Sequence, residues 1–126
     1  MTLSESREDY LENLLIIETR SGGFVRQVDM ASRMGFSKAS ISKAMSSLSA
    51  EGYVEFRPRG LVRLSNGGRK IAERVYDRHC FFFKVLTNLG IPTEIAQRDA
   101  CRMEHAMSEE SYQALKKELS SKMDVQ

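Results

Sequence analysis

Several residue types are scarce in this sequence, and each shortage argues against a class of protein. Tryptophan is absent, and cysteine, proline and histidine occur only twice each in 126 residues. Cys80 and Cys101 stand alone, with no CxxC pair, so they do not indicate the disulfide framework of a small secreted domain. We expect two thiols in a reducing compartment, used for packing or for metal binding.

Long apolar runs are missing as well. No run approaches the roughly 18 to 20 residues of a membrane span, and Glu5, Arg7, Glu8 and Asp9 interrupt any signal peptide. The HExxH motif, a glycine-rich phosphate loop and an activated nucleophile are also absent. We therefore expect a cytoplasmic protein with no membrane partner, no enzyme activity and no small organic substrate.

The charge is small in total but unevenly distributed. The formal net charge is +2, and hydrophobic residues make up 41% of the chain, which is ordinary for a globular protein. Residues 36–70 contain seven lysines and arginines against two acids, a local charge of +5, so the rest of the chain has −3. A basic segment of this kind indicates a polyanionic partner such as nucleic acid.

Apolar residues at steps of three and four predict three helices in the first half, over residues 7–19, 27–34 and 38–50. Gly35 suits the left-handed turn that ends the second, and Ser37 suits the N-cap of the third. The residues expected to face the core are Tyr10, Leu11, Leu14, Leu15, Ile17, Val28, Ala31, Met34, Ile41, Met45 and Leu48.

After Gly52 the pattern changes to two short runs, residues 53–56 and 61–64, which predict a β-hairpin around Pro58 and Gly60. Beyond it we expect a long helix over about 65–89, a fifth over about 93–107 and a sixth that begins after Ser108. The expected buried side of the long helix is Ile71, Val75, Phe82, Leu86 and Leu89, and core or dimer-interface packing is expected of Cys80, Phe81, Phe82, Phe83, Val85 and Met103.

These elements predict a mainly α fold in two parts. Residues 1–64 form a winged helix-turn-helix, with three helices and a two-stranded wing. Residues 65–126 form a helical metal-binding and dimerisation domain that begins with the long linking helix.

The third helix and the wing have the side chains of a DNA-binding element. Short polar residues allow a helix to approach base edges, and flanking cations contact phosphates. The alternative is a plain helical hairpin with a solvated basic face, which the charge distribution and the basic hairpin tip disfavour. The predicted DNA-binding residues are Ser37, Lys38, Ala39, Ser40, Ser42, Lys43, Arg57, Arg59 and Arg63.

The most specific chemical pattern is C-x-x-E-H, in which Cys101, Glu104 and His105 would share one face of a helix. Asp9 and Glu12 are likewise three residues apart on the first helix. His79 falls on the apolar side of the long helix, where an imidazole needs a partner.

Each of these residues also has an ordinary interpretation. Asp9 and Glu12 would suit the dipole of a helix N-terminus. His79 alone would be a hydrogen-bonded core histidine, and Cys101 alone a small buried hydrophobic residue.

With these residues identified, the chain resembles the diphtheria toxin repressor family of iron- and manganese-dependent repressors over essentially its whole length. The similarity runs from EDYLE at 8–12, through LSAEGYV at 48–54, to Arg78 and His79 and to CRMEHAMS at 101–108. The resemblance implies ligands from the first helix, the long helix and the C-x-x-E-H segment. The implied set is Asp9, Glu12, His79, Cys101, Glu104 and His105.

The resemblance is mixed between the two branches of the family. Asp9 and Glu12 look like the manganese-dependent branch, whereas Cys101 looks like the iron-dependent branch. Phe83 and Gln97 stand where iron-dependent members have the ligands of an ancillary metal site, so the resemblance implies that this site is lost. It also implies a short, manganese-repressor-like architecture of two domains, without a C-terminal SH3-like domain.

The function implied by the resemblance is metal-dependent repression. A homodimer would bind a palindromic operator in double-stranded DNA when Mn(II) or Fe(II) is present, and would repress metal-uptake genes. Zn(II) or Co(II) would also occupy such a site in vitro. Two alternatives stay open: a winged-helix regulator that senses redox state or an organic ligand, and a small helical metalloenzyme.

Overall fold

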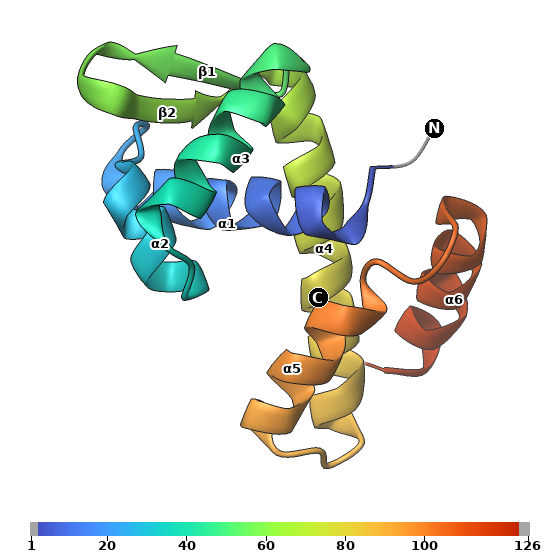
Figure 1. The fold of residues 1–126 in the computed structure, drawn as a ribbon. Coiled ribbons are helices and arrows are strands. Elements are labelled where there is room, and N and C mark those ends of the chain that lie inside the picture. The colour runs from blue at the N-terminus through green and yellow to red at the C-terminus, as the bar shows by residue number, and fades with distance from the viewer. Residues whose placement is uncertain (1–2, 124–126) are drawn as a thin grey trace. The chain divides into compact units, whose positions relative to one another are not determined.

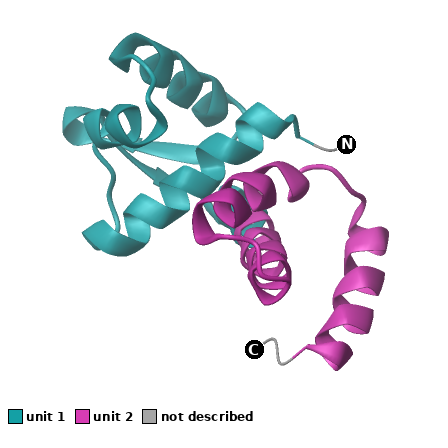
Figure 2. Cartoon of the chain, turned by 90° about the horizontal axis from the view of Figure 1, so that it is seen from below, with its two compact units in different colours: residues 1–73 teal, residues 74–126 magenta. Residues whose placement is uncertain are grey.

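The structure, a computed structural model, describes residues 3–123. The chain forms two compact units that meet between Glu73 and Arg74, called unit 1 and unit 2 below (Figure 2). The long helix α4 (Asn66–Asn88) contributes its first turns to unit 1 and the rest to unit 2. The domain boundary after residue 64 therefore stays a prediction, because the compact units divide within this helix.

Unit 1 is a winged helix-turn-helix, as the sequence predicts (Figure 1). Its elements in chain order are α1 (Glu5–Ser21), α2 (Gln27–Met34), α3 (Lys38–Ala50), β1 (Val54–Arg57) and β2 (Leu61–Leu64). Ser4 caps α1 by accepting a hydrogen bond from the backbone N–H of Arg7.

The turn between α2 and α3 has the predicted chemistry. Gly35 adopts a left-handed backbone with φ of 71°, and its N–H donates to the carbonyl of Ala31. Ser37 then caps α3 by accepting from the N–H of Ser40. The reversal between the two helices is therefore fixed by one glycine and one serine.

The wing is an antiparallel hairpin in which Val54 pairs with Leu64 and Arg57 pairs with Leu61. A short 3-10 turn, Pro58–Gly60, joins the strands. Val25 adds an isolated bridge to Val62, which fastens the wing to the segment between α1 and α2.

The core of unit 1 confirms most of the predicted buried positions and corrects one. Val28 is 42% exposed, whereas Met30 is fully buried. Met30, Ala31 and Met34 share one side of α2 at steps of one, three and four, so the buried side is rotated away from Val28. The core residues are Leu11, Leu14, Leu15, Val25, Met30, Ala31, Ile41, Met45, Leu48, Val54, Val62, Leu64 and Ala72.

The start of α4 is held tightly against the base of the wing. Ser65 caps the helix by accepting from the N–H of Gly68. The Cα of Gly68 lies so close to the carbonyl of Tyr53 that no side chain fits there. Nearby, buried Glu18 accepts from the N–H of Leu64 and forms an ion pair with Arg69. The contact of Gly68 with Tyr53 and the ion pair of Arg69 with Glu18 of α1 both join the first turn of α4 to other parts of unit 1. They therefore fix where α4 begins.

Unit 2 contains the remainder of α4, α5 (Thr93–Met103) and α6 (Glu109–Lys122). Its core joins Phe81 and Phe82 of α4 to Ala100 of α5 and Tyr112 of α6, and Phe81 meets Tyr112 edge to face with ring centroids 5.7 Å apart. Phe83, Val85 and Met103 pack at its edge, as predicted.

Two predictions for unit 2 are wrong. Leu89 is 72% exposed, because α4 ends at Asn88 and Leu89 belongs to the turn that follows. The fifth helix ends at Met103, not near residue 107, so Glu104 and His105 lie beyond its last residue. None of the helices between residues 3 and 123 has the length and apolar character needed to cross a membrane.

Candidate metal centre and nucleic-acid interface

Glu104 and His105 lie in the tight turn between α5 and α6. The N–H of Glu104 still donates to the carbonyl of Ala100, which makes Glu104 the C-cap of α5. The next two bonds are shorter-range, from the N–H of His105 to Arg102 and from the N–H of Ala106 to Met103. The side chains of Glu104 and His105 therefore project from a turn and not from the helix that the sequence predicted.

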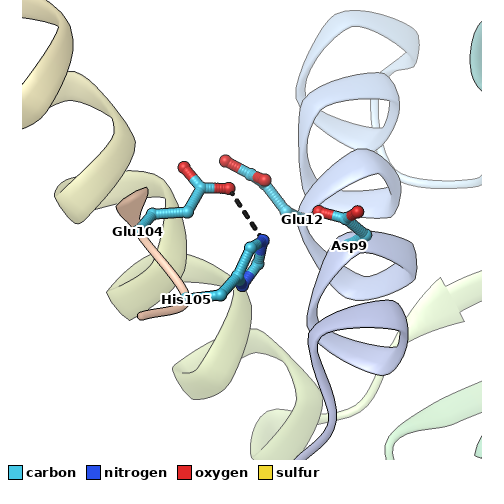
Figure 3. A group of neighbouring side chains, drawn as sticks. All are labelled: Asp9, Glu12, Glu104 and His105. Carbon is cyan, nitrogen blue, oxygen red and sulfur yellow. Dashed lines mark ion pairs between the residues drawn. The ribbon is translucent and has the colours of Figure 1, made fainter. Parts of the chain in front are cut away.

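The carboxylate of Glu104 lies between two imidazoles. Its Oε2 is 2.9 Å from Nδ1 of His79, on α4, and its Oε1 is 3.2 Å from Nε2 of His105. Figure 3 shows the second of these ion pairs as a dashed line. The Glu104 side chain is fully buried, and the His105 side chain is only 3% exposed. Unit 2 thus brings together three of the predicted ligands.

His79 has a hydrogen-bond partner at each ring nitrogen. Nδ1 faces Glu104, and Nε2 lies 2.6 Å from Oε1 of Gln97, on α5. The hydrogen bond to Glu104 is the main reason that the pKa of His79 lies above its ordinary value; burial opposes the shift and the bond to Gln97 adds to it. The ring is also stacked on Tyr76, with an interplanar angle of 14°.

Arg78 holds the turn that contains Glu104 and His105. Its Nη1 donates to the carbonyls of Glu104 and Met107, at 3.2 and 2.7 Å. Its Nη2 pairs with Glu109 at 2.9 Å, and its guanidinium lies 4.8 Å from the centre of the Tyr112 ring. A buried arginine therefore binds the carbonyl of Glu104 at the end of α5 and the carbonyl of Met107 just before α6, and so holds both ends of the turn.

The other three predicted ligands lie on two further helices. Asp9 and Glu12 extend from one side of α1 in unit 1, one turn apart (Figure 3). Glu12 is buried and Asp9 half-buried. Cys101 is a half-buried free thiol on α5, and no hydrogen bond joins it to another residue within 3–123.

The sequence did not predict the contacts that Arg78 and Gln97 make around the candidate site. The adjacency of Arg78 to His79 was one available signal, because neighbouring helix residues project about 100° apart and can reach opposite sides of one turn. Gln97 was identified only as standing where iron-dependent members have an ancillary ligand, which did not predict its hydrogen bond to His79.

The predicted DNA-binding residues of α3 are all exposed. Ser37 caps the helix and its hydroxyl also bonds to that of Ser40, at 3.0 Å. The exposed residues that follow Ser37 are Lys38, Ala39, Ser40, Ser42 and Lys43.

The three wing arginines differ in their surroundings. Arg59 occupies the tip with a left-handed backbone, φ of 67°. Arg57 and Arg63 both pair with Glu55, at 3.4 and 2.9 Å, and Arg63 also lies over the ring of Phe24. Arg59 is therefore the wing cation most open to a partner, while the other two share one carboxylate.

Comparison with known proteins identifies the family. Residues 2–62 match the model for the iron dependent repressor N-terminal DNA binding domain, and residues 65–122 match that for the iron dependent repressor metal binding and dimerisation domain. The transcriptional regulator MntR of Escherichia coli O6:H1 is 39% identical over 109 residues, which cover 86% of this chain and 70% of that protein. The chain belongs to the iron dependent repressor family. Its members are metal-dependent transcriptional regulators, which confirms the predicted resemblance and fold class.

The chain is also similar to the HTH-type transcriptional regulator MntR of Geobacillus kaustophilus, with 33% identity over 104 residues, 82% of this chain and 72% of that one. Among solved structures, a manganese-dependent transcriptional repressor in complex with manganese superposes with a TM-score of 0.80 at 27% identity, covering 90% of this chain and 52% of that chain. T. acidophilum IdeR gives a TM-score of 0.77 at 24% identity, with 95% and 55% covered, and supports the fold alone. The chain thus spans about half the length of these solved structures.

Proposed function

We propose that this protein is a cytoplasmic, metal-activated repressor of metal-uptake genes that binds a palindromic operator as a homodimer. The match to a DNA-binding domain and to a metal-binding and dimerisation domain supports this function. So does the similarity to a structure described as a manganese-dependent transcriptional repressor with manganese. Mn(II) or Fe(II) is the proposed effector.

The proposal depends most on one observation, the buried carboxylate of Glu104 between the imidazoles of His79 and His105. Carboxylate oxygen and imidazole nitrogen are donors that divalent manganese, iron, cobalt and zinc accept. A buried carboxylate also needs a compensating partner, and the imidazoles of His79 and His105 provide hydrogen-bonding nitrogens on both of its sides. The three residues therefore fit a divalent ion.

Asp9, Glu12 and Cys101 are proposed to complete the ligand set. Carboxylates favour Mn(II), whereas thiolate and imidazole shift the preference toward Fe(II) and the later metals. A bound ion would offset the negative charge of the carboxylates and the thiolate, and would also accept the neutral imidazoles. Zn(II) and Co(II) are expected to occupy the same donors in vitro.

The proposed regulation follows from the location of the ligands in both units. Asp9 and Glu12 belong to unit 1, with the DNA-binding helices, and the other four belong to unit 2. Ligands in both units would restrict motion of α1, and a dimer must hold its two recognition helices about 34 Å apart to read a palindrome. To change the ratio of DNA-binding-competent to incompetent conformations from 1:99 to 99:1, the metal would have to bind the competent conformation more strongly by about 5.5 kcal/mol.

The proposed contacts to DNA come from α3 and the wing. Ser37, Lys38, Ala39, Ser40, Ser42 and Lys43 would face the major groove, because short side chains let the helix approach base edges. Arg57, Arg59 and Arg63 would contact the backbone or the minor groove. Glu55 competes for two of these arginines, so Arg59 is expected to contribute most.

The test is DNA binding measured against metal supply. An operator is first selected from random duplexes by the Mn(II)-loaded protein, and its affinity is then measured by fluorescence anisotropy under anaerobic conditions. We expect tight binding with Mn(II) or Fe(II) and weak binding with a chelator. Binding that ignores metal but responds to an oxidant would instead establish a redox-sensing regulator, and equal affinity under all conditions would refute regulation by metal.

A further inference from the structure

The tip of the wing is held by a contact from outside the hairpin. Nε2 of Gln27, the first residue of α2, donates to the carbonyl of Gly60 at 2.9 Å. The paired strands end at Arg57 and Leu61, so the tip, Pro58–Gly60, lies outside the strand pairing. Gln27 is not among the residues proposed above to contact DNA, and its contact with the tip calls for an explanation.

The backbone of the tip has a conformation that needs support. Arg59 and Gly60 are both left-handed, with φ of 67° and 73°, and Arg59 is the only residue other than glycine with a positive φ between residues 3 and 123. For a residue with a Cβ this conformation is unfavourable, and it persists where surrounding contacts hold the chain in place. The hydrogen bond from Gln27 is a contact of this kind, made to the residue directly after Arg59.

Gln27 itself is anchored on both sides along the chain. Three residues later, Met30 is fully buried in the core of unit 1. Two residues earlier, Val25 exchanges backbone hydrogen bonds with Val62 of β2, at 2.8 and 2.9 Å. Gln27 therefore gives the wing tip an attachment to the body of the helix-turn-helix.

We propose that Gln27 is a positioning residue for DNA binding, which holds the wing tip so that the guanidinium of Arg59 is already placed to meet a phosphate of the duplex. This inference rests on the proposed contact between Arg59 and DNA. Arg59 is exposed, whereas Arg57 and Arg63 are paired with Glu55, so the tip has the most open cation of the wing. A tip that is fixed before binding loses less conformational freedom when the complex forms, which raises affinity without any additional contact.

Three variants of the full chain and one control test this role. Gln27→Met removes the N–H donor and preserves most of the packing, because methionine has a similar length. Arg59→Ala removes the cation but keeps a residue with a Cβ at the left-handed position. The double variant shows whether the two side chains act together. Gln113→Met is the matched control, because Gln113 is an exposed glutamine of α6 that bonds to Glu109.

Two measurements are compared among these variants. Fluorescence anisotropy gives the affinity of the Mn(II)-loaded protein for the selected operator, and we expect Q27M to weaken binding on the order of 10-fold, as one hydrogen bond is lost in each wing of a dimer. Q113M should bind as the unsubstituted protein does, and Q27M should have little further effect in the R59A background, because no cation is left to position. ¹⁵N relaxation of the metal-free protein should show greater picosecond-to-nanosecond motion of the Arg59 and Gly60 amides in Q27M.

The outcomes separate this inference from the proposed function. Unchanged affinity or unchanged tip motion in Q27M, or an equal loss of affinity with and without Arg59, would overturn the role of Gln27 and leave the DNA contact of Arg59 standing. Unchanged affinity in R59A would overturn the contact at the wing tip itself, and the inference with it.

Discussion

Among single residues, Glu104 has the most demanding surroundings. Its side chain is fully buried, and both carboxylate oxygens lie beside imidazole nitrogens, at 2.9 and 3.2 Å. Burial of an isolated negative charge is strongly unfavourable, so the charge persists only with positive charge or a metal nearby. The same contacts that stabilise Glu104 without metal are therefore those that an ion would replace.

Glu104→Gln is expected to weaken Mn(II) binding by about 100-fold or more, since removal of a ligand should exceed the effect of removing one of its supporting partners. Glutamine has nearly the same shape, so circular dichroism should show an unchanged fold. Isothermal titration calorimetry measures the affinity. Glu110→Gln, in the exposed first turn of α6, is the control, and equal affinity of the two variants would contradict the assignment of Glu104.

Asp77 is a second acidic residue whose charge has a consequence, in this case for the stability of the fold and not for metal binding. Burial works against its ionisation, yet hydrogen bonds from Lys116 and Tyr112 outweigh burial and hold the pKa of Asp77 below its ordinary 3.8. A lowered folded-state pKa means that ionised Asp77 stabilises the fold above the unfolded pKa, and that this contribution disappears as pH falls through the folded value.

Asp77→Asn should accordingly lower the free energy of unfolding at neutral pH. The gap between the two proteins should close at acidic pH, below the ordinary value of 3.8. Urea titrations across this pH range measure the free energy of unfolding of both proteins. Asp99→Asn is the control, because Asp99 of α5 has only a long ion pair with Arg98, at 4.0 Å. A gap that stays constant with pH would show that the charge of Asp77 contributes nothing.

At the scale of helices and strands, most beginnings and ends could be predicted because they depend on local signals. Ser37 and Gly35 mark the ends of α3 and α2, and the hairpin follows from Pro58 and Gly60 between two short apolar runs. The end of α5 could not be predicted in this way, because Met103, Ala106 and Met107 continue the helical period. Arg78, 26 residues before Glu104, binds the carbonyls of Glu104 and Met107 in the turn, and this contact exists only in the folded chain.

The first turn of α4 gives a test at the same scale. Gly68→Ala would place a methyl group against the carbonyl of Tyr53, and overpacking of this kind is expected to destabilise the fold by about 1–3 kcal/mol. Gly67→Ala is the matched control, because its nearest neighbour would be Oγ of Ser65 at 3.9 Å, and alanine there should stabilise the helix by about 0.5–1 kcal/mol. Thermal unfolding compares them, and equal melting temperatures would contradict the packing described for Gly68.

For the whole molecule, the sequence predicted two functional parts because charge and ligand types are segregated along the chain. The basic residues gather in 36–70, and four of the six proposed ligands lie in 79–105 of unit 2, where Glu104 contacts two of them. The sequence did not predict the details that depend on contacts distant in the chain, such as the pairing of Gln97 with His79. The position of α5 depends on the burial of Ala96 and Ala100, and two alanines form no charge pattern or motif that could be recognised in the sequence.

Salt dependence tests the DNA-binding part of the whole protein. Arg59→Ala should reduce the slope of log affinity against log salt by about 0.9 for each phosphate that is no longer neutralised, or about 1.8 for a dimer. Affinity for unrelated duplexes should fall in parallel, because recognition of phosphates is independent of sequence. Arg98→Ala, an exposed arginine of α5, is the control, and an unchanged slope for Arg59→Ala would exclude a phosphate contact at the wing tip.

The shared pairing of Arg57 and Arg63 with Glu55 has a consequence for discrimination between sites. A phosphate that takes either arginine must first displace the carboxylate, so the wing offers random duplexes less attraction than its three cations suggest. An operator whose shape brings a DNA phosphate close enough to replace Glu55 at Arg57 or Arg63 would be bound in preference to other duplexes. If the wing contacts DNA as proposed, Glu55 of β1 would therefore lower the affinity for unrelated duplexes.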